Sequence, residues 1–431
     1  MKEIIIKILN IINNKLWIFI SVLIIYTGSY FTYMLKGIQL NIVKMIKELF
    51  KKEEKNTGIS SFKTLMLSLA GRIGVGSISG IALAIYLGGP GTIFWIWFIS
   101  LISAPLTFAE TYLGIKYKDR DKNNNSIGGP SYYIKKALNN KKLASLYSII
   151  IIISYISGFI SIQSNTITKS ITTIYNINPL IIGLILSIIT LIIIFGGINK
   201  IANTTSKIVP IMSLLYIGTS LYITITNIYL IPNIIKSIIS SAFNIKAFTT
   251  SFLPIMILGV QRGIFSSETG IGTCAIAAST GDNNSPISEG YIQMFGIYIT
   301  SFLICTSTAI IILTSNYKIL NINDINGIEI ASHAFKYHLG NNGNILLVML
   351  IILFAFSTIL TGYYYGESCL EFFNKSNKLY IIMLKLITII IIFIGSFFSS
   401  TIMWKFTDLL IAIPILINTY AIIKLKDEIK K

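Results

Sequence analysis

Long apolar stretches recur along most of the chain. Eleven of them are long enough to cross a bilayer, which takes about 20 residues of helix. They cover residues 16–36, 64–87, 91–115, 145–173, 179–196, 207–230, 248–278, 292–315, 344–372, 379–398 and 402–424. Isoleucine runs favour strands in water, but in lipid a helix satisfies its own backbone hydrogen bonds. The pattern predicts an all-α integral membrane protein with about 11 transmembrane helices.

The composition supports this interpretation. Of the 431 residues, 53% are hydrophobic and 12% are charged, whereas soluble domains carry roughly 25% charged residues. Lipid must therefore cover much of the surface. No long polar linker divides the chain, so we expect one multi-pass bundle in the cell membrane. The net charge of +18 does not indicate nucleic-acid binding, because the lysines lie between apolar stretches. No obligate protein partner is predicted.

The distribution of lysine and arginine predicts the orientation. When residues near the ends of spans are counted with the adjoining loops, the N-terminal side of the membrane carries nine of these residues, the opposite side carries 23, and three lie deeper within spans. Positive charge accumulates on the cytoplasmic side. We therefore expect the N-terminus outside, the C-terminus in the cytoplasm, and the main cytoplasmic loops at 37–63 and 116–144.

Two of the spans are interrupted by glycines, at residues 71–80 and 259–272. Glycine lets a helix open, and interrupted spans at corresponding places in two halves indicate a transporter's binding site. Each interrupted span begins a set of five, and an odd number makes the two sets run in opposite senses. The chain then divides into an extra helix and loop (1–63), a first five-helix repeat (64–230), an inverted second repeat (248–424) and a cytoplasmic tail (425–431). The alternative is that the glycines only allow close helix packing.

Arginine is rare and is concentrated at these interruptions. The chain has three arginines, and two of them, Arg72 and Arg262, lie in the glycine-rich stretches. Charge within a span is costly and marks a functional group or a buried pair. The candidate partners are Glu110, Glu268 and Glu367. A structural ion pair and a gating role both remain open.

An opened helix exposes backbone groups that can bind ligands. Freed carbonyls and hydroxyls suit a sodium ion, while freed amides suit the carboxylate of an amino acid. Ser357 and Thr358 place adjacent hydroxyls in the ninth span, although they can also bond back to their own helix. Gln163 is polar in the middle of the fourth span. It can face a cavity or hold helices together.

Several stretches resemble the alanine or glycine:cation symporter family. Residues 71–82 read GRIGVGSISGIA, similar to the family's ARVGTGNIAGVA, and residues 88–97 read GGPGTIFWIW, similar to GGPGAxFWMW. Residues 262–272 read RGIFSSETGIG, where the family has RGLFSNEAGMG. The segment 128–134, GGPSYYI, continues the match. The resemblance extends over about residues 20–420.

The resemblance implies a leucine-transporter-like fold of two inverted five-helix repeats with two discontinuous helices. It implies sodium-coupled symport of a small neutral amino acid by alternating access, with sodium as the coupling ion, no organic cofactor and no enzymatic activity. The implied substrate-binding residues are Val75, Gly76, Ser77, Gln163, Phe265 and Gly362. The implied sodium ligands are the carbonyls near Ala70 and Ile73 and the hydroxyls of Ser357 and Thr358. From the residues themselves we expect Arg72, Arg262 and Glu268 to be structural or gating charges.

The chain departs from the family pattern at four positions. Ser77 and Ser267 replace asparagines, Thr300 replaces an aspartate, and Gly362 replaces a tryptophan. Loss of the tryptophan enlarges the pocket unless a neighbour such as Tyr363 fills it, so a neutral amino acid bulkier than alanine is our hypothesis. A proton-coupled or uncoupled amino-acid exchanger of the same fold is the alternative. A membrane-embedded enzyme is disfavoured, because the spans carry no paired histidines and no Asp-His set.

Overall fold

The computed structural model describes residues 2–51, 58–121, 124–243, 252–320, 326–373, 378–398 and 400–430. The first half contains α1 (Lys2–Met34), α2 (Ile42–Leu49), α3 (Ser61–Arg72), α4 (Ser79–Gly88), α5 (Gly91–Lys116), α6 (Pro130–Lys136), α7 (Lys141–Ile153), α8 (Ile160–Thr172), α9 (Pro179–Ile194) and α10 (Gly197–Thr226). The second half contains α11 (Ile231–Ala242), α12 (Leu253–Ser267), α13 (Thr273–Ala278), α14 (Pro286–Ile297), α15 (Thr306–Leu313), α16 (Gly327–Glu371), α17 (Lys378–Gly395) and α18 (Ser400–Lys424). One small hairpin pairs β1 (Asp119–Arg120) with β2 (Ser126–Ile127).

Several spans combine two helices. A π-helical turn, Ser154–Phe159, joins α7 to α8, and a second, Tyr298–Cys305, joins α14 to α15. Gly340 interrupts α16 with a positive φ of 63°. Among the described residues, eight helices are long and apolar enough to cross a membrane, or nine when α3 and α4 count as one bent span. Since α9 and α12 are shorter, eleven crossings stay a prediction.

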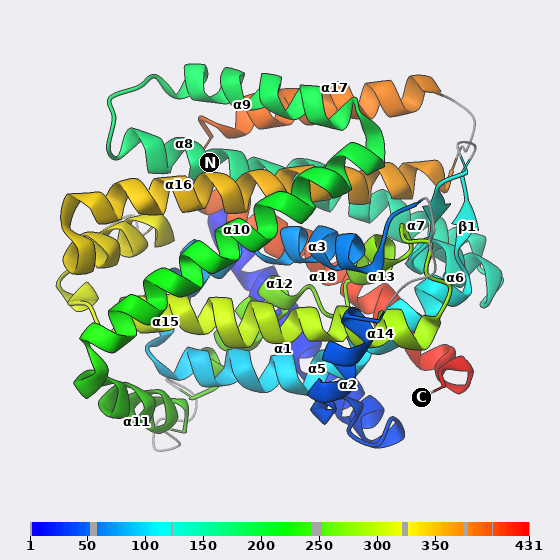
Figure 1. The fold of residues 1–431 in the computed structure, drawn as a ribbon, viewed down its shortest axis with the longest axis horizontal. Coiled ribbons are helices and arrows are strands. Elements are labelled where there is room, and N and C mark those ends of the chain that lie inside the picture. Colours follow the sequence, from blue (N-terminus) through cyan, green and yellow to red (C-terminus); the bar gives the residue numbers. More distant parts are fainter. Residues whose placement is uncertain are drawn as a thin grey trace.

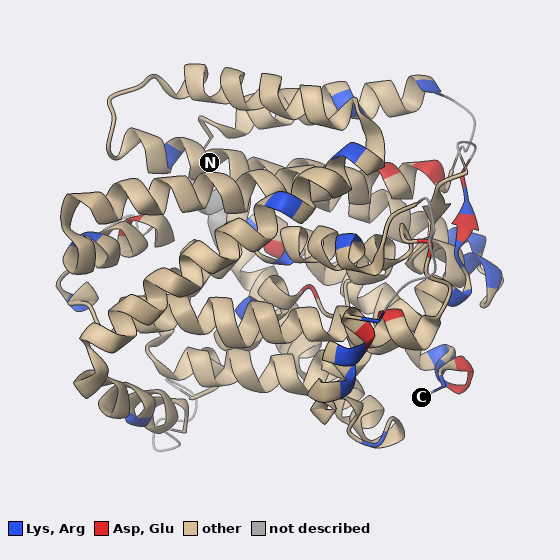
Figure 2. Ribbon diagram, viewed as in Figure 1, with Lys and Arg blue, Asp and Glu red and all other residues tan. Residues whose placement is uncertain are grey.

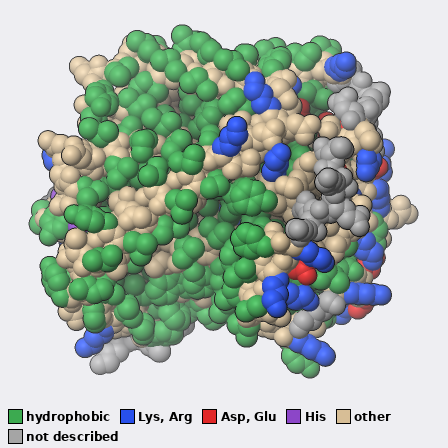
Figure 3. Space-filling model, in the orientation of Figure 1, with side chains coloured by type: hydrophobic (Ala, Val, Ile, Leu, Met, Phe, Trp, Pro, Cys, Tyr) green, Lys and Arg blue, Asp and Glu red, His purple; other side chains and the backbone are tan. Residues whose placement is uncertain are grey.

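Among the long apolar helices that the structure describes, α5 is the most buried. In its most apolar window 72% of the residues are buried, against 28% for α17, which lies with α9 at one edge (Figure 1). Small residues explain the close packing of α5. A Cβ on Gly263 of α12 would lie 2.5 Å from Ile99 of α5, so only glycine fits there. Extended apolar surfaces remain on the outside, where lipid covers them (Figure 3).

Charged residues gather at one end of the bundle. Lysines and acidic residues cluster around β1, α6 and the C-terminus, and charged residues are more sparsely distributed over the rest of the bundle (Figure 2). This distribution is typical of a chain whose loops carry charge and whose middle lies in lipid.

Candidate functional site

The second predicted span is broken in the middle. Helix α3 ends at Arg72, α4 begins at Ser79, and the two helix axes differ by 59°. Only one 3-10 turn, Val75–Ser77, lies between them. Glycine is needed in this segment because a Cβ on Gly74 would lie 2.6 Å from the Thr358 Oγ1 atom.

The seventh predicted span is broken as well. Helix α12 ends at Ser267 and α13 begins at Thr273. Between them Glu268, Gly270 and Gly272 have φ angles of 54°, 80° and 96°. These left-handed conformations end a right-handed helix, and glycine adopts them readily. The prediction of two discontinuous helices is confirmed.

Gln163 of α8 contacts the break of the second span directly. Its Oε1 atom accepts a hydrogen bond of 3.1 Å from the Val75 backbone N–H, one of the groups that the break leaves without a helical partner. The Ser77 hydroxyl donates to the Arg72 carbonyl at 3.3 Å, and the Ser77 carbonyl accepts from Thr308 at 2.7 Å. Gln163 and Ser77 therefore both lie at the break.

Aromatic rings cover the break of the second span. A Cβ on Gly76 would lie 2.8 Å from the Phe265 ring. The ring of Phe265 stacks on Phe159 at 4.9 Å, Phe159 stacks on Tyr155 at 4.4 Å, and on its other side Phe265 packs on Trp404 at 5.2 Å. These four rings, which we call the aromatic column, close this side of the break.

Gly362 of α16 faces the far end of the aromatic column. A Cβ there would lie 3.5 Å from Tyr155 and 3.5 Å from Ile160, which is ordinary van der Waals contact. From outside its own helix, Tyr155 and Ile160 border the space that a side chain at position 362 would enter.

The predicted sodium ligands come together in part. The Thr358 hydroxyl donates to the Ala70 carbonyl at 2.7 Å, which joins α16 to the end of α3. Ile73 is fully buried and leaves the helical conformation, with φ −91° and ψ 64°. The Ser357 hydroxyl instead bonds back to the Phe354 carbonyl at 2.9 Å. Hard oxygen donors are thus present, and an ion requires the Thr358 hydroxyl to turn away from its carbonyl partner.

Arg262 pairs with a residue that the sequence analysis did not consider. Its guanidinium binds both carboxylate oxygens of Asp408 in α18, at 3.1 and 3.3 Å, and none of the three glutamates proposed as partners. The same guanidinium lies over the Trp404 ring at 5.1 Å. The sequence could have identified Asp408 as a candidate partner, because it is the only acidic residue in its apolar span.

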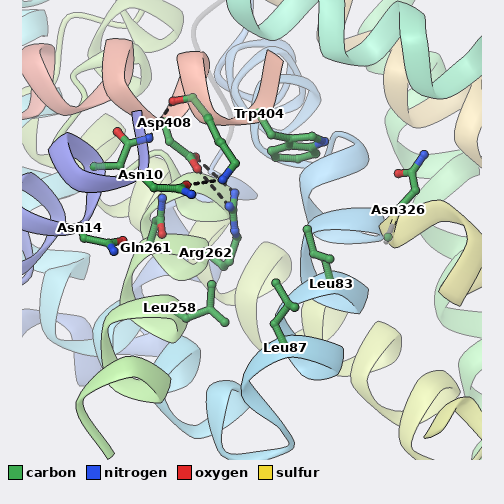
Figure 4. Close-up of a pocket in the computed structure, with 13 residues that line it drawn as sticks. Asn10, Asn14, Leu83, Leu87, Leu258, Gln261, Arg262, Asn326, Trp404 and Asp408 are labelled. Carbon is green, nitrogen blue, oxygen red and sulfur yellow. Dashed lines mark hydrogen bonds and ion pairs between the residues drawn. The ribbon is translucent and has the colours of Figure 1, made fainter. Parts of the chain in front are cut away.

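A cavity of about 400 Å³ lies beside this ion pair (Figure 4). Asn10 and Asn14 of α1 line it from one side, and Leu83 and Leu87 of α4 from another. Helix α1 also holds α18 at this point. The Asn13 amide donates to the Lys405 carbonyl at 2.8 Å, and the Trp17 ring N–H donates to the Asp408 carbonyl at 3.2 Å.

Arg72 and Glu268 lie at the two breaks themselves, Arg72 at the end of α3 and Glu268 directly after α12. Arg72 donates to the Gln293 carbonyl at 2.9 Å and to the Cys274 sulfur. In the described part of the chain no carboxylate oxygen lies within 4 Å of its guanidinium. Glu268 accepts one hydrogen bond from Tyr155 and one from Thr273, each of 2.8 Å. These contacts join the breaks to the surrounding helices.

An apolar bundle with two broken helices, whose freed backbone groups meet buried polar side chains, defines a membrane transporter of the leucine-transporter-like class. Residues 2–431 match the profile of the sodium:alanine symporter family, and the chain belongs to that family. It is therefore a secondary transporter of amino acids and not an enzyme.

Named relatives and one solved structure agree with this assignment. The chain is 36% identical to the probable sodium/glutamine symporter GlnT of Bacillus subtilis, over 98% of this chain and 88% of that protein. It is 32% identical to the sodium/alanine symporter AgcS of Methanococcus maripaludis, over 96% and 94%. The crystal structure of MhsT in complex with L-phenylalanine has a TM-score of 0.62 and 14% identity, over 87% of this chain and 90% of MhsT, and it shares the fold.

Proposed function

We propose that this chain couples the entry of sodium to the uptake of a neutral amino acid. The contact between Thr358 and the Ala70 carbonyl carries the proposal, because it brings a hydroxyl and a freed carbonyl together at the end of a broken helix. Oxygen atoms of this kind are ligands for hard cations. The sodium-coupled names of two relatives support the same ion. The remaining ligands that we propose are the Ile73 carbonyl and the Ser357 hydroxyl.

The amino acid is proposed to bind between the two breaks. Val75, Gly76 and Ser77 would meet its carboxylate and Gln163 its polar groups, while Phe265 would cover it. The closed aromatic column over Gly76 fits a state in which this site is sealed from the cavity. Alternating access then requires the column to separate at the Phe265–Trp404 contact, which opens the site to the cavity beside Arg262.

The side chain of the substrate is proposed to be larger than that of alanine. Gly362 leaves a position without a side chain next to Tyr155 and Ile160, and one relative is named for glutamine.

The orientation proposed from the lysines places the cavity outside. Helix α5 starts at the cavity end and ends at Lys116, next to the charged hairpin, after 26 residues. We also propose that residues 64–230 and 248–424 form the two inverted five-helix repeats.

A competition panel in proteoliposomes tests the substrate and the ion together. Purified protein is given labelled glutamine with and without a sodium gradient, at fixed membrane potential and pH. Unlabelled alanine, serine, threonine, valine and glutamine compete. We expect sodium-dependent uptake that the larger neutral amino acids inhibit. Tight binding of alanine with exclusion of the others would refute the size proposal, and uptake indifferent to sodium would refute the coupling proposal.

A further inference from the structure

A second group of charged side chains is buried between the two breaks. Glu110 of α5 and Glu268 of the second break are 0% exposed, and Arg72 of α3 is 1% exposed. The two carboxyl groups outnumber the one guanidinium in this group. Ionised carboxylates buried without a matching cation are strongly disfavoured. One of the two carboxyls is therefore expected to hold a proton.

The hydrogen bonds distinguish the two glutamates. Both oxygens of Glu268 accept a hydroxyl hydrogen bond, which suits an ionised carboxylate. Within the described ranges, Glu110 accepts one strong hydrogen bond, of 2.9 Å, from the Asn418 amide to its Oε2 atom, and it also faces the Cys274 thiol, which is a weak donor. In the part of the chain that the structure describes, its buried Oε1 atom has no hydrogen-bond partner. A buried carboxylate oxygen without a donor marks Glu110 as the group that takes the proton.

The other titratable groups near Glu110 do not supply the missing positive charge. Those that face it are Arg72 of α3, Glu268, Cys274 of α13, Tyr133 of α6 and Tyr147 of α7. Helix α14, which packs on α5, brings Glu289, which is bonded to Ser61 and Thr64 instead. Arg262 of α12 is already paired with Asp408 of α18. Arg72 therefore acts on both carboxyl groups through its charge and forms a close ion pair with neither among the described residues.

Asn418 connects Glu110 to the break in the seventh span. Its amide nitrogen donates to Glu110 and also, at 2.9 Å, to the carbonyl of Gly270. Its amide oxygen accepts a hydrogen bond from the Tyr133 hydroxyl. Gly270 is one of the left-handed residues that keep the seventh span open. A change of charge on Glu110 thus acts directly on a group that holds the break.

We propose that Glu110 is a proton-binding site and that Asn418 transmits its charge state to the break at Gly270. The proposal rests on the proposed transport function and adds a second ion to it. Proton binding forms an O–H bond on the carboxyl group and removes its negative charge, so the closed conformation described above is favoured. Proton loss leaves a buried anion, and the region then opens to admit water or a cation.

Infrared spectroscopy of the purified full-length protein tests proton binding without any substrate. Wild-type protein, Glu110→Gln and the control Glu367→Gln are compared between about pH 5 and about pH 9. Glutamine keeps the size of Glu110 and an acceptor for Asn418. Glu367 is another buried glutamate, outside this group. We expect a protonated-carboxyl band in the wild type and in Glu367→Gln that Glu110→Gln lacks. A band of equal strength in Glu110→Gln, or no band in the wild type, would overturn the proton site.

Transport assays in proteoliposomes test the connection through Asn418. In the wild type we expect glutamine uptake to change by at least about tenfold across this pH range, and one titrating group limits the change to about tenfold per pH unit. Glu110→Gln should flatten the profile. Asn418→Leu should flatten it while the infrared band remains. An unchanged profile in Asn418→Leu would refute the connection. If no variant, wild type included, carries any amino acid while the band behaves as expected, the transport proposal fails and the proton site stands.

Discussion

The ion pair between Arg262 and Asp408 provides the sharpest quantitative prediction. Both side chains are largely buried, at 9% and 6% exposure, and the guanidinium lies on the Trp404 ring of the aromatic column. The pair therefore joins α12 to α18 in the closed conformation. Asp408→Asn keeps the size and one acceptor oxygen but removes the charge. The closed conformation should lose stability relative to the open one.

The size of the effect follows from burial. Removing one partner of a buried ion pair costs about 3–5 kcal/mol, whereas exposed pairs contribute at most about 1 kcal/mol. Here one side of the pair borders the cavity of about 400 Å³, so water compensates part of the loss. We expect about 2 kcal/mol, which lies between these two limits. It corresponds to an increase of about 30-fold in the ratio of open to closed protein.

Cysteine accessibility measures this ratio. Ser77 is fully buried in the closed conformation and is replaced by cysteine, in a background in which Cys274, Cys305 and Cys369 are substituted. The rate of alkylation by a membrane-impermeant reagent should rise about 30-fold when Asp408→Asn is added.

The control is a double-mutant cycle with Arg262→Gln. If the pair acts as a unit, adding Arg262→Gln to Asp408→Asn should change the rate little. A coupling free energy below about 0.5 kcal/mol would refute the reasoning. An Asp408→Asn rate equal to that of the parent protein would do so as well.

Three further substitutions test other contacts. Thr358→Val removes a hydroxyl that bonds to the Phe354 carbonyl of its own helix and also to the Ala70 carbonyl of α3, so the sodium concentration for half-maximal uptake should rise about tenfold or more. Ser357→Ala should change it less, because that hydroxyl bonds to the Phe354 carbonyl and the Met212 sulfur. Gly76→Ala places a methyl group 2.8 Å from an aromatic ring and should reduce uptake about 100-fold, while Gly218→Ala, which meets nothing within 4 Å, should leave uptake unchanged. Trp17→Phe removes one hydrogen bond to α18, which is worth about 1 kcal/mol, and should speed alkylation of a cysteine at position 77 about fivefold. Equal alkylation rates would show that this bond does not stabilise the closed state.

Much of the architecture could be predicted from the sequence, for reasons that are physical. Lipid requires long apolar helices, so the spans stand out as uninterrupted hydrophobic stretches. The glycines at 71–80 and 259–272 identified both breaks, because left-handed or close-packed backbone leaves few alternatives to glycine. The π-helical turn at Ser154–Phe159 could not be foreseen, since it adds one residue to a turn without altering the apolar pattern.

The contacts at the site were harder to predict. Gln163 and Thr358 are recognisable in the sequence as polar groups in apolar helices. The sequence also allowed each of them another role, such as bonding to a neighbouring helix or to its own helix. Only the three-dimensional arrangement shows that both contact the broken span. Asp408 was overlooked although it is charged within a span. Its pairing with Arg262 joins residues 146 positions apart, a separation that no local pattern encodes.

The extra helix at the N-terminus has a consequence for how far the protein can move. Helix α1 holds α18 through Asn13 and Trp17, both next to the ion pair. Any swing of α18 away from α12 must therefore either carry α1 along or break these bonds. If α1 lies outside both repeats, as we expect from the sequence, it limits how far α18 can move, and shortening α1 should allow a larger movement of α18 without changing the substrate that is carried.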